Sequence, residues 1–575
     1  MEDAPSTTAG NSASRLGNLR SLLPIFQWLP KYDKKFLTWD LIAGITLASF
    51  VLPESMAYAT LAGLPVQSGI YCCLAGGLFF ALFTTAKQVA VGPTSAISLM
   101  VGTTVATMSG GDLSRWISIA ELTALIIFVI CLLAFIFKLS SLVSFISESI
   151  LLGFKAGAAL SIAVTQLPKI FGVEGGGSNF FERVATVIRH LPDTNMTVFL
   201  FGMAALALLI IGDKLFPGRP VSLVVVIASI LVVSFTPLSS SLHITGEIPS
   251  GLPSFGRPSL RFNDVNGVVG LAFGCFLMGY IETVSAARTF ALKNNYEINP
   301  RQELLALGTA NLAAAFSNAY PVSGGLSQST VNEKSGAKTP LSLIICSATL
   351  AILLLFFTGL LKNLPEVLLA VIVIHAVAGL IKVKELIRIY RLSKLEFLIA
   401  MISILGVLTF GILNGVIMAA ILSIAFLLRR TAIPNVAVLG RIGDTDRYSD
   451  IERHPDNVLI EGVMILRVES SILYFNVDHI RSLIMKHLSE NEGKVKLMIL
   501  DMSASPYVDV AGSKMLLQLS KELNQRGITF RIVEALYGVR DLLRMQGMEE
   551  VTGHISRKMT IQDEVNEFLN RKQSA

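Results

Sequence analysis

A succession of apolar segments decides the fold class of this chain. Between about Trp39 and Leu428, one apolar stretch follows another, and each is long or nearly long enough to cross a bilayer. Over the whole chain, 52% of residues are hydrophobic and 15% are charged, whereas soluble domains carry about 25% charged residues. Because lipid offers the backbone no hydrogen-bond partners, such segments must be helices. The sequence therefore predicts an α-helical polytopic membrane protein.

We expect fourteen transmembrane segments, of which the third and tenth are short and rich in small or hydroxyl residues. Their approximate ranges are 39–61, 69–85, 94–108, 117–137, 148–167, 197–213, 221–236, 267–290, 302–318, 324–335, 341–361, 365–381, 396–410 and 412–428. With a cytoplasmic N-terminus, 21 Lys and Arg residues lie on the cytoplasmic side and 7 on the other. This bias is typical of membrane proteins and predicts a multi-pass cell-membrane protein with both termini in the cytoplasm.

The composition changes after the last apolar segment. Strand-like runs at 462–468, 496–500 and 529–533 alternate with helical patterns at 477–488, 511–526, 539–545 and 560–569. Such alternation over about 110 residues predicts a small α/β domain. We expect a cytoplasmic N-terminal segment at 1–38, a transmembrane domain at 39–430, a linker at 431–457 and the soluble domain at 458–572.

Several function classes are not favoured by the sequence. The net charge of +6 is small for 575 residues and does not indicate nucleic-acid binding. The five cysteines lie in apolar runs without a histidine at metal-ligand spacing, so we expect no metal, no disulfide and no cofactor. There is no Walker loop and no other enzyme motif. Because the chain has no Walker loop, the energy for any transport activity must come from gradients across the membrane.

Two short stretches at membrane depth carry no run of large apolar side chains. They are Gly92–Ser98 (GPTSAIS) and Pro321–Thr330 (PVSGGLSQST). Both are suited to begin half-helices whose free N–H groups face a polar ligand, each with about half a positive charge. We expect the two starts to meet and hold an anion, although two kinked helices packed through small residues is the alternative. The expected contacts are Thr94, Ser95, Ala96, Gly324, Gly325, Leu326 and Ser327.

Two carboxylates lie inside predicted spanning segments, Glu54 in LPESMAY and Glu282 in GYIETVSAA. A charge at the bilayer centre costs at least about 2.5–3.5 kcal/mol, so each should face a cavity or a partner. Such a carboxyl group can carry a proton alongside an anion, or it can simply bond a neighbouring helix. We expect smaller roles for Lys155, as a snorkelling or paired residue, and for His375, as a satisfied core histidine.

The membrane half is predicted to contain an internal repeat. An offset of 228 residues superposes Glu54 on Glu282 and Pro93 on Pro321. This offset spans seven predicted segments, and an odd number of crossings turns the second copy upside down. The sequence thus favours 7+7 inverted repeats, with the ligand site at the repeat interface.

With these motifs in hand, the chain resembles the sulfate permease family of anion transporters over nearly its full length. The resemblance rests on LPESMAYATLAGLP, VGPTSAISLMVG, GYIETVSAARTFA and NPRQELLALGTANLAAAFSNAYPVSGGLSQSTVNEKSGAKTP. It implies a core domain and a gate domain, a homodimer, and an elevator-like motion of the core.

The soluble domain resembles a STAS domain through the segment LMILDMSASPYVDVAGSKMLLQL. In soluble relatives of this module, a serine just ahead of the glycine is phosphorylated, whereas this chain has Ala511 there. The resemblance therefore implies a role in regulation or assembly without that switch. A cytoplasmic regulator is a possible partner.

One departure from the family pattern bears on the substrate. Many members have an arginine in the tenth segment, where this chain has Gln328. Without that cation, we expect the site to hold helix-end partial charges, hydroxyls, an amide and the nearby carboxyl group of Glu54. A sulfate dianion would be less well compensated, which favours bicarbonate or an anion accompanied by a cation. Tyr58 and Gln328 complete the expected substrate-binding set.

The sequence favours a secondary active transporter of small anions of the sulfate, bicarbonate or dicarboxylate class. Glu282 would take the coupling ion, H⁺ or Na⁺, and Glu54 would shape or protonate the site. An uncoupled exchanger or channel-like anion path is the alternative within transport. A nucleobase-type carrier of neutral solutes on the same fold, and a membrane-anchored regulator, are alternatives from other classes.

Overall fold

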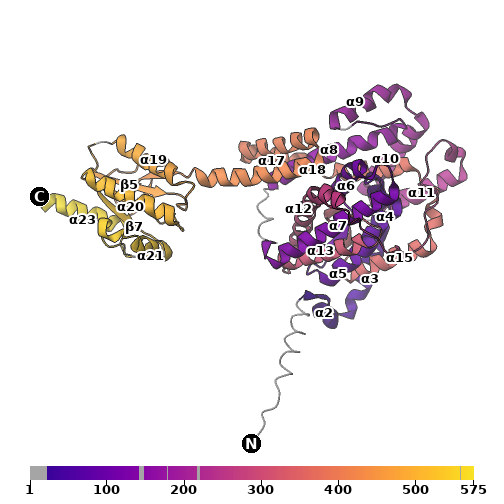
Figure 1. Ribbon diagram of the computed structural model, residues 1–575, viewed down its shortest axis with the longest axis horizontal. Coiled ribbons are helices and arrows are strands. Elements are labelled where there is room, and N and C mark those ends of the chain that lie inside the picture. Colours follow the sequence, from indigo (N-terminus) through magenta and orange to yellow (C-terminus); the bar gives the residue numbers. More distant parts are fainter. Residues whose placement is uncertain are drawn as a thin grey trace, which may run out of the picture. The chain divides into compact units, whose positions relative to one another are not determined.

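The computed structural model describes residues 22–140, 148–177, 179–216, 220–491, 493–556 and 558–574 (Figure 1). The chain divides into two compact units, Met1–Ser423 and Ile424–Ala575. The first unit is helical and holds nearly all of the predicted apolar segments. The second contains a five-stranded sheet.

The described residues of the first unit and its last helix confirm the fourteen predicted segments. Eight helices are long and apolar enough to cross a membrane, and shorter ones lie between them. The last helix is divided into two segments at Gly411, where the backbone is not helical (φ +84°). The segments are α3 (Leu37–Leu61), α4 with α5 (Val66–Tyr71 and Gly77–Phe83), α6 (Ser95–Ser109), α7 (Leu113–Ile136), α8 (Glu148–Phe171), α10 (Met196–Leu215), α11 (Val221–Phe235), α12 (Phe262–Lys293), α13 (Pro300–Ala315), α14 (Leu326–Lys334), α15 (Leu341–Phe356), α16 (Glu366–Ala378) and the two parts of α18 (Lys394–Ala432).

Among the described residues before the α/β unit, three shorter α-helices lie outside these segments. They are α2 (Ile25–Trp28), α9 (Phe180–His190) and α17 (Val383–Leu392). The last two are amphipathic, with apolar residues such as Phe181 and Ile387 exposed on one face. This pattern is typical of helices that lie along a membrane surface.

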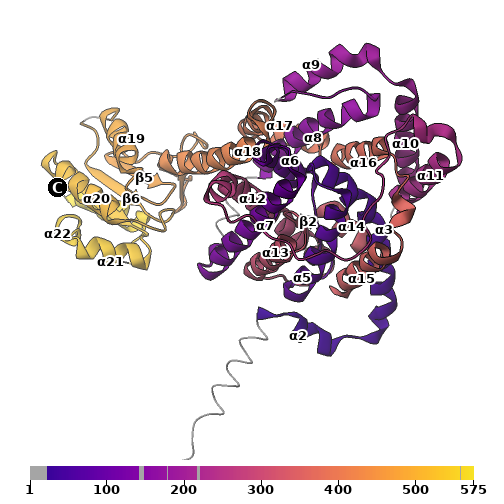
Figure 2. The same ribbon diagram turned by 45° about the vertical axis from the view of Figure 1, so that its right-hand side comes forward.

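The membrane helices pack as two groups. In the first, which we call the core group, α12 packs on α6 and α7, α13 on α5 and α7, and α14 and α15 on α3. In the second, the gate group, α8 packs on α10 and α16, and α10 packs on α11. Figure 2 shows α8, α10, α11 and α16 gathered on one side of the unit, with α5, α7, α12 and α13 on the other. The expected division into core and gate is thereby confirmed.

A two-stranded ladder joins the two halves of the sequence inside the core group. Strand β1 (Ala90–Gly92) pairs antiparallel with β2 (Ser323–Gly325), with Val91 opposite Gly324. Helix α6 begins at Ser95, separated from β1 by Pro93 and Thr94, and α14 begins at Leu326, directly after β2. The predicted half-helix starts therefore do meet. The two helix starts lie 231 residues apart, three more than the repeat offset of 228. The reason is that the stretch from Pro321 to the start of α14 is longer than the stretch from Pro93 to the start of α6.

The second unit forms a mixed sheet in the order β4-β3-β5-β6-β7. Strands β5 (Val463–Val468), β6 (Leu497–Asp501) and β7 (Thr529–Val533) are parallel, as expected from strands that alternate with helices. Helices α19 (Val477–Ser489), α20 (Val510–Gln525) and α21 (Tyr537–Met545) pack on one face, and α23 (Ile561–Ser574) on the other.

The expected linker at 431–457 is only partly a linker. Strand β3 (Val436–Arg441) pairs with β5, and β4 (Tyr448–Asp450) pairs with β3. Val436 and Leu439 are buried against the sheet. The glycines and charged residues around this short apolar run are typical of a linker, although the run forms an edge hairpin of the sheet.

Close packing of α4 on α3 fixes the position of Glu54. An added Cβ at Gly69 would lie 1.9 Å from the carbonyl oxygen of Ser55, the residue after Glu54. We expect Gly69→Ala to force the two helices apart at a cost of about 1–3 kcal/mol. The melting temperature of the purified protein should fall.

The matched control is Gly270→Ala on α12, where an added Cβ would meet nothing within 4 Å. This variant should melt like the wild type. An equal melting temperature for the two variants would contradict the predicted tight crossing.

Candidate functional site

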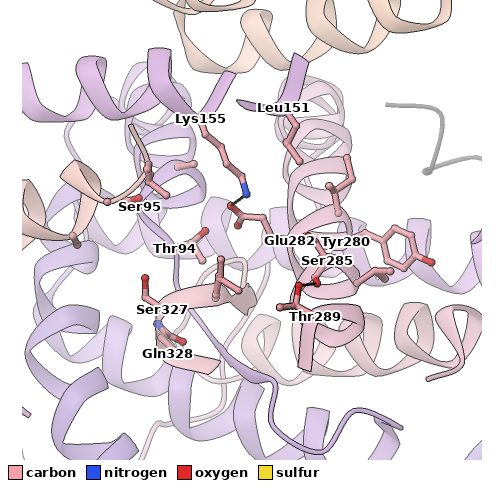
Figure 3. A pocket seen from close by; sticks show the side chains of 18 of the residues that line it. Thr94, Ser95, Leu151, Lys155, Tyr280, Glu282, Ser285, Thr289, Ser327 and Gln328 are labelled. Atoms are coloured by element: carbon pink, nitrogen blue, oxygen red, sulfur yellow. Dashed lines mark hydrogen bonds and ion pairs between the residues drawn. The ribbon is translucent and has the colours of Figure 1, made fainter. Parts of the chain in front are cut away.

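A cavity of about 660 Å³ lies where the two half-helix starts face the gate group (Figure 3). Its walls come from α3, α6, α12 and α14 of the core group and from α8 and α16 of the gate group. Nine predicted substrate-binding residues line it, together with Glu282. They are Glu54, Tyr58, Thr94, Ser95, Ala96, Gly325, Leu326, Ser327 and Gln328.

The half-helix starts supply donors and partial positive charge to this cavity. The first-turn N–H groups of an α-helix have no acceptor within the helix, so those after Thr94 and Gly325 can serve a ligand. The Thr94 hydroxyl lies 3.4 Å from that of Ser323, which ties the two starts together. Ser327 is exposed in the cavity wall. Hydroxyl and amide donors in a cavity wall are suited to an oxyanion.

Gly324 is the one predicted contact that does not line the cavity. Its N–H donates to Thr283 Oγ1 at 2.9 Å, on the side of β2 that packs against α12. An added Cβ there would lie 2.9 Å from Thr283 Cα. The glycine is needed for this close approach, and its N–H fixes β2 instead of binding a ligand.

Glu54 is held by hydrogen bonds on both oxygens. Tyr58 donates its hydroxyl to Oε1 at 2.9 Å, and Gln328 Nε2 donates to Oε2 at 3.2 Å. The same amide nitrogen donates to the carbonyl of Pro93 at 3.3 Å. Since both neighbours are acceptors, the orientation of the amide is chemically determined. Gln328 thus connects α14 with α3 and with the start of α6.

Glu282 faces a cation across the cavity. Lys155 Nζ, on α8, lies 3.7 Å from Glu282 Oε1, and Figure 3 shows the lysine reaching from its helix toward the carboxylate. Oε2 of Glu282 is buried and has no hydrogen-bond partner among the described residues. The pair joins the gate group to the core group.

The cavity lining thus includes a cationic side chain in addition to the helix ends, hydroxyls, amide and carboxyl group that the sequence predicts. The predicted pairing of Lys155 is confirmed by its contact with Glu282, but the sequence did not place it at the cavity. The rule that singled out Glu54 and Glu282, a charge within a spanning segment, applies equally to Lys155 and could have found it. What the sequence lacks is the angle at which α8 presents the side chain.

His375 is placed differently from a core histidine. Its Nε2 lies 2.7 Å from Asp213 Oδ2, and both side chains are partly exposed. This pair links α16 with α10 in the gate group, away from the cavity lining. It needs no role in binding.

The α/β unit has its own ordered helix start. Asp509 caps α20 by accepting from the N–H of Gly512, and it also accepts from the N–H of Tyr474. Ala511 lies in the first turn of this helix, where a methyl group offers no site for phosphorylation. The cap orders the loops at the carboxyl ends of β5 and β6.

The fold and cavity together define a multi-pass membrane transporter for small anions. Family models agree with this class: the sulfate permease family matches residues 37–403, and the STAS domain matches residues 454–567. The chain belongs to the sulfate permease family and carries a C-terminal STAS domain.

Curated relatives cover almost the whole chain. A probable sulfate transporter of Mycobacterium tuberculosis is 31% identical over 542 residues, which are 94% of this chain and 97% of that protein. Sulfate transporter 4.1, chloroplastic, of Arabidopsis thaliana is 30% identical over 576 residues, with 96% of this chain and 84% of the relative covered.

Solved structures confirm the fold. Murine Solute Carrier 26 family member A9, an anion transporter, matches with a TM-score of 0.88 and 23% identity over 99% of this chain and 96% of the other. The transmembrane domain of the cyanobacterial bicarbonate transporter BicA matches with a TM-score of 0.59 and 20% identity over 68% of this chain and 98% of that domain.

The bond from Gly324 to Thr283 generates a prediction for the site. Thr283→Val keeps the shape of the side chain but leaves the buried N–H of Gly324 without an acceptor, which costs about 1–3 kcal/mol. We expect a lower melting temperature and weaker anion binding. Thr283→Ser retains the hydroxyl and should stay near the wild type. Equal behaviour of the two variants would show that this bond does not hold the site.

Proposed function

We propose that this chain is a secondary active transporter that moves small anions of the sulfate, bicarbonate or dicarboxylate class, coupled to H⁺ or Na⁺. The observation that carries this proposal is the meeting of two half-helix starts, a lysine and two carboxylates at one cavity. The starts and the lysine attract an anion, and the carboxylates offer a place for a cation.

The two carboxylates have different surroundings, which suggests different roles. Glu54 accepts hydrogen bonds on both oxygens from Tyr58 and Gln328, so its position is fixed and it shapes the site. Glu282 has one oxygen near Lys155 and a second one without a partner among the described residues. We assign the coupling ion to Glu282.

The substrate class draws on the relatives. The curated relatives are named sulfate transporters, and one structural neighbour is a bicarbonate transporter. Gln328 is neutral, which leaves less compensation for a dianion than a cation at that position would give. Bicarbonate or another monovalent anion therefore stands beside sulfate as a candidate.

The transport step we propose is an elevator motion of the core group against the gate group. The ladder of β1 and β2 binds both half-helix starts into one piece that moves together, while α8 and α16 form the opposing wall. We further propose a homodimer in the cell membrane with cytoplasmic termini, residues 39–430 as the transporter domain, and a STAS domain that receives a cytoplasmic regulator.

An uncoupled anion exchanger is the second candidate. It is favoured by two further cations in the cavity lining, Arg288 and Lys382, which can attract an anion without a coupled cation. Purified protein in liposomes distinguishes the two, with sulfate, bicarbonate, chloride and a dicarboxylate offered under separate proton and sodium gradients. Accumulation driven by either gradient supports coupling, and flux indifferent to both supports exchange.

Glu282→Gln tests the coupling role. The variant removes the group that we expect to take the cation, so uptake driven by a proton or sodium gradient should fall at least tenfold, an order-of-magnitude estimate for loss of a group essential to coupling. Anion exchange without a gradient should persist. Glu385→Gln on α17, which does not line the cavity, is the control. Full gradient dependence in Glu282→Gln would remove Glu282 from the mechanism.

Gln328→Arg tests the substrate class. A guanidinium group at this position would add a fixed positive charge between Glu54 and the half-helix starts. Binding of sulfate should strengthen relative to bicarbonate. Gln328→Met has a similar length without charge and serves as the control. If sulfate affinity is the same in both variants, the anion does not bind beside α14.

A further inference from the structure

The cavity brings together an unusual set of charges, and their arrangement suggests how the anion is compensated. The titratable and charged groups that face it are Glu54 and Tyr58 of α3, Lys155 of α8, Tyr280, Glu282 and Arg288 of α12, and Lys382 just before α17. Arg288 and Lys382 are exposed, so water and salt screen them. Lys155 is the cation whose side chain is mostly buried, with 21% of it exposed.

Lys155 and Glu282 are incompletely paired. A lysine has three N–H donors and a carboxylate can accept at two oxygens, yet one contact of 3.7 Å joins them. The second carboxylate oxygen is buried without a partner among the described residues. A buried charge pair gains stability only when its remaining donors and acceptors are satisfied. A ligand that supplies the missing partner would therefore bind favourably here.

The half-helix starts line the same cavity as this pair. Thr94, at the start of α6, appears beside Lys155 and Glu282 in Figure 3, with Ser327 and Gln328 at the start of α14 across from them. An anion held by the two starts would thus lie within the space that Lys155 enters. Among the described residues, Glu54 makes no ion pair with this lysine, and Tyr58 and Gln328 each donate a hydrogen bond to one of its oxygens.

We propose that Lys155 compensates the charge of the transported anion and that Glu282 competes with the anion for Lys155. Protonation of Glu282 from the water of the cavity releases the lysine, and the anion then takes the place of the carboxylate. This inference rests on the proposed function and deepens it, because it names the coupling ion as a proton and the favoured substrate as a monovalent anion.

Charge balance supports that choice of substrate. In the empty site, Lys155 and ionised Glu282 sum to zero. With one monovalent anion and one proton on Glu282, the sum is again zero. A dianion with a single proton leaves one negative charge that Lys155 does not compensate. Only the partial charges of the two helix starts can offset it, and Glu54 lines the same cavity, so a monovalent anion is the better match. Ionised Glu282 therefore disfavours anion binding in the empty site, and protonated Glu282 favours a monovalent anion in the occupied site.

Binding to the purified full-length protein tests the inference. Chloride, bicarbonate and sulfate are titrated by calorimetry at two pH values, one unit apart, in sodium-free buffer. In the wild type, chloride should bind more tightly at the lower pH. Lys155→Gln should weaken chloride binding about tenfold to hundredfold, the range for a bond to a charged group. Glu282→Gln should instead tighten it and abolish its pH dependence.

The opposite signs of these two effects separate the proposal from a structural role. If the pair merely held α8 against α12, both variants would weaken binding together, and that outcome overturns the proposal. Unchanged chloride binding in Lys155→Gln overturns it as well. Lys362→Gln, an exposed lysine paired with Glu247 outside the cavity, is the matched control and should bind as the wild type does.

A relocated cation gives a second test. The double variant Lys155→Gln with Gln328→Arg moves the positive charge from α8 to α14, so chloride binding should return without its former pH dependence. Where Lys155→Gln does not fold, as judged by its melting temperature without anions, Lys155→Arg provides the second variant. It keeps the positive charge, so chloride binding and its pH dependence should persist, and loss of chloride binding in a folded Lys155→Arg would contradict the proposal.

Failure of this inference can be told from failure of the proposed function. If the wild type binds and transports no anion in liposomes, the proposed function is wrong. If it transports anions but Lys155→Gln does so with wild-type affinity, only the assignment of Lys155 is wrong. Sodium that strengthens chloride binding equally at both pH values would exclude the proton as the coupling ion.

Discussion

The antiparallel pairing of β1 with β2 is the interaction on which the site depends. Two half-helices that begin in the middle of a bilayer leave backbone groups without partners, and lipid cannot satisfy them. The ladder satisfies some of these groups and fixes the distance between the starts of α6 and α14. Thr283 adds a further acceptor for Gly324. Irregular backbone at this depth is stable because it is paired and enclosed by protein.

Much of the architecture could be predicted because bilayers impose simple constraints. Segment length and the distribution of Lys and Arg led to fourteen segments, including the short third and tenth ones. The small residues around Pro93 and Pro321 marked the half-helix starts, because few other roles suit such residues at membrane depth. Glu54 and Glu282 stand out as carboxylates inside apolar segments, and Gln328 stands out through the arginine that many family members have at its position. All three line the cavity.

What the sequence could not provide is the direction in which side chains and backbone groups point. Gly324 lies in the expected segment, but its N–H faces α12. Lys155 is a visible cation within an apolar segment, yet its approach to Glu282 depends on how α8 packs against α16 and α10, which no local pattern encodes. Strand β3 falls in the predicted linker because six residues carry too little periodicity to outweigh the polar residues around them.

The size of the cavity has a consequence for how ions are distinguished. A space of about 660 Å³ accommodates on the order of twenty water molecules. An anion can therefore enter with part of its hydration shell and exchange those waters for amide and hydroxyl donors one at a time. Ionic radius is a weak criterion in so roomy a vestibule. Small solutes of the same valence should displace one another there, however different their shapes.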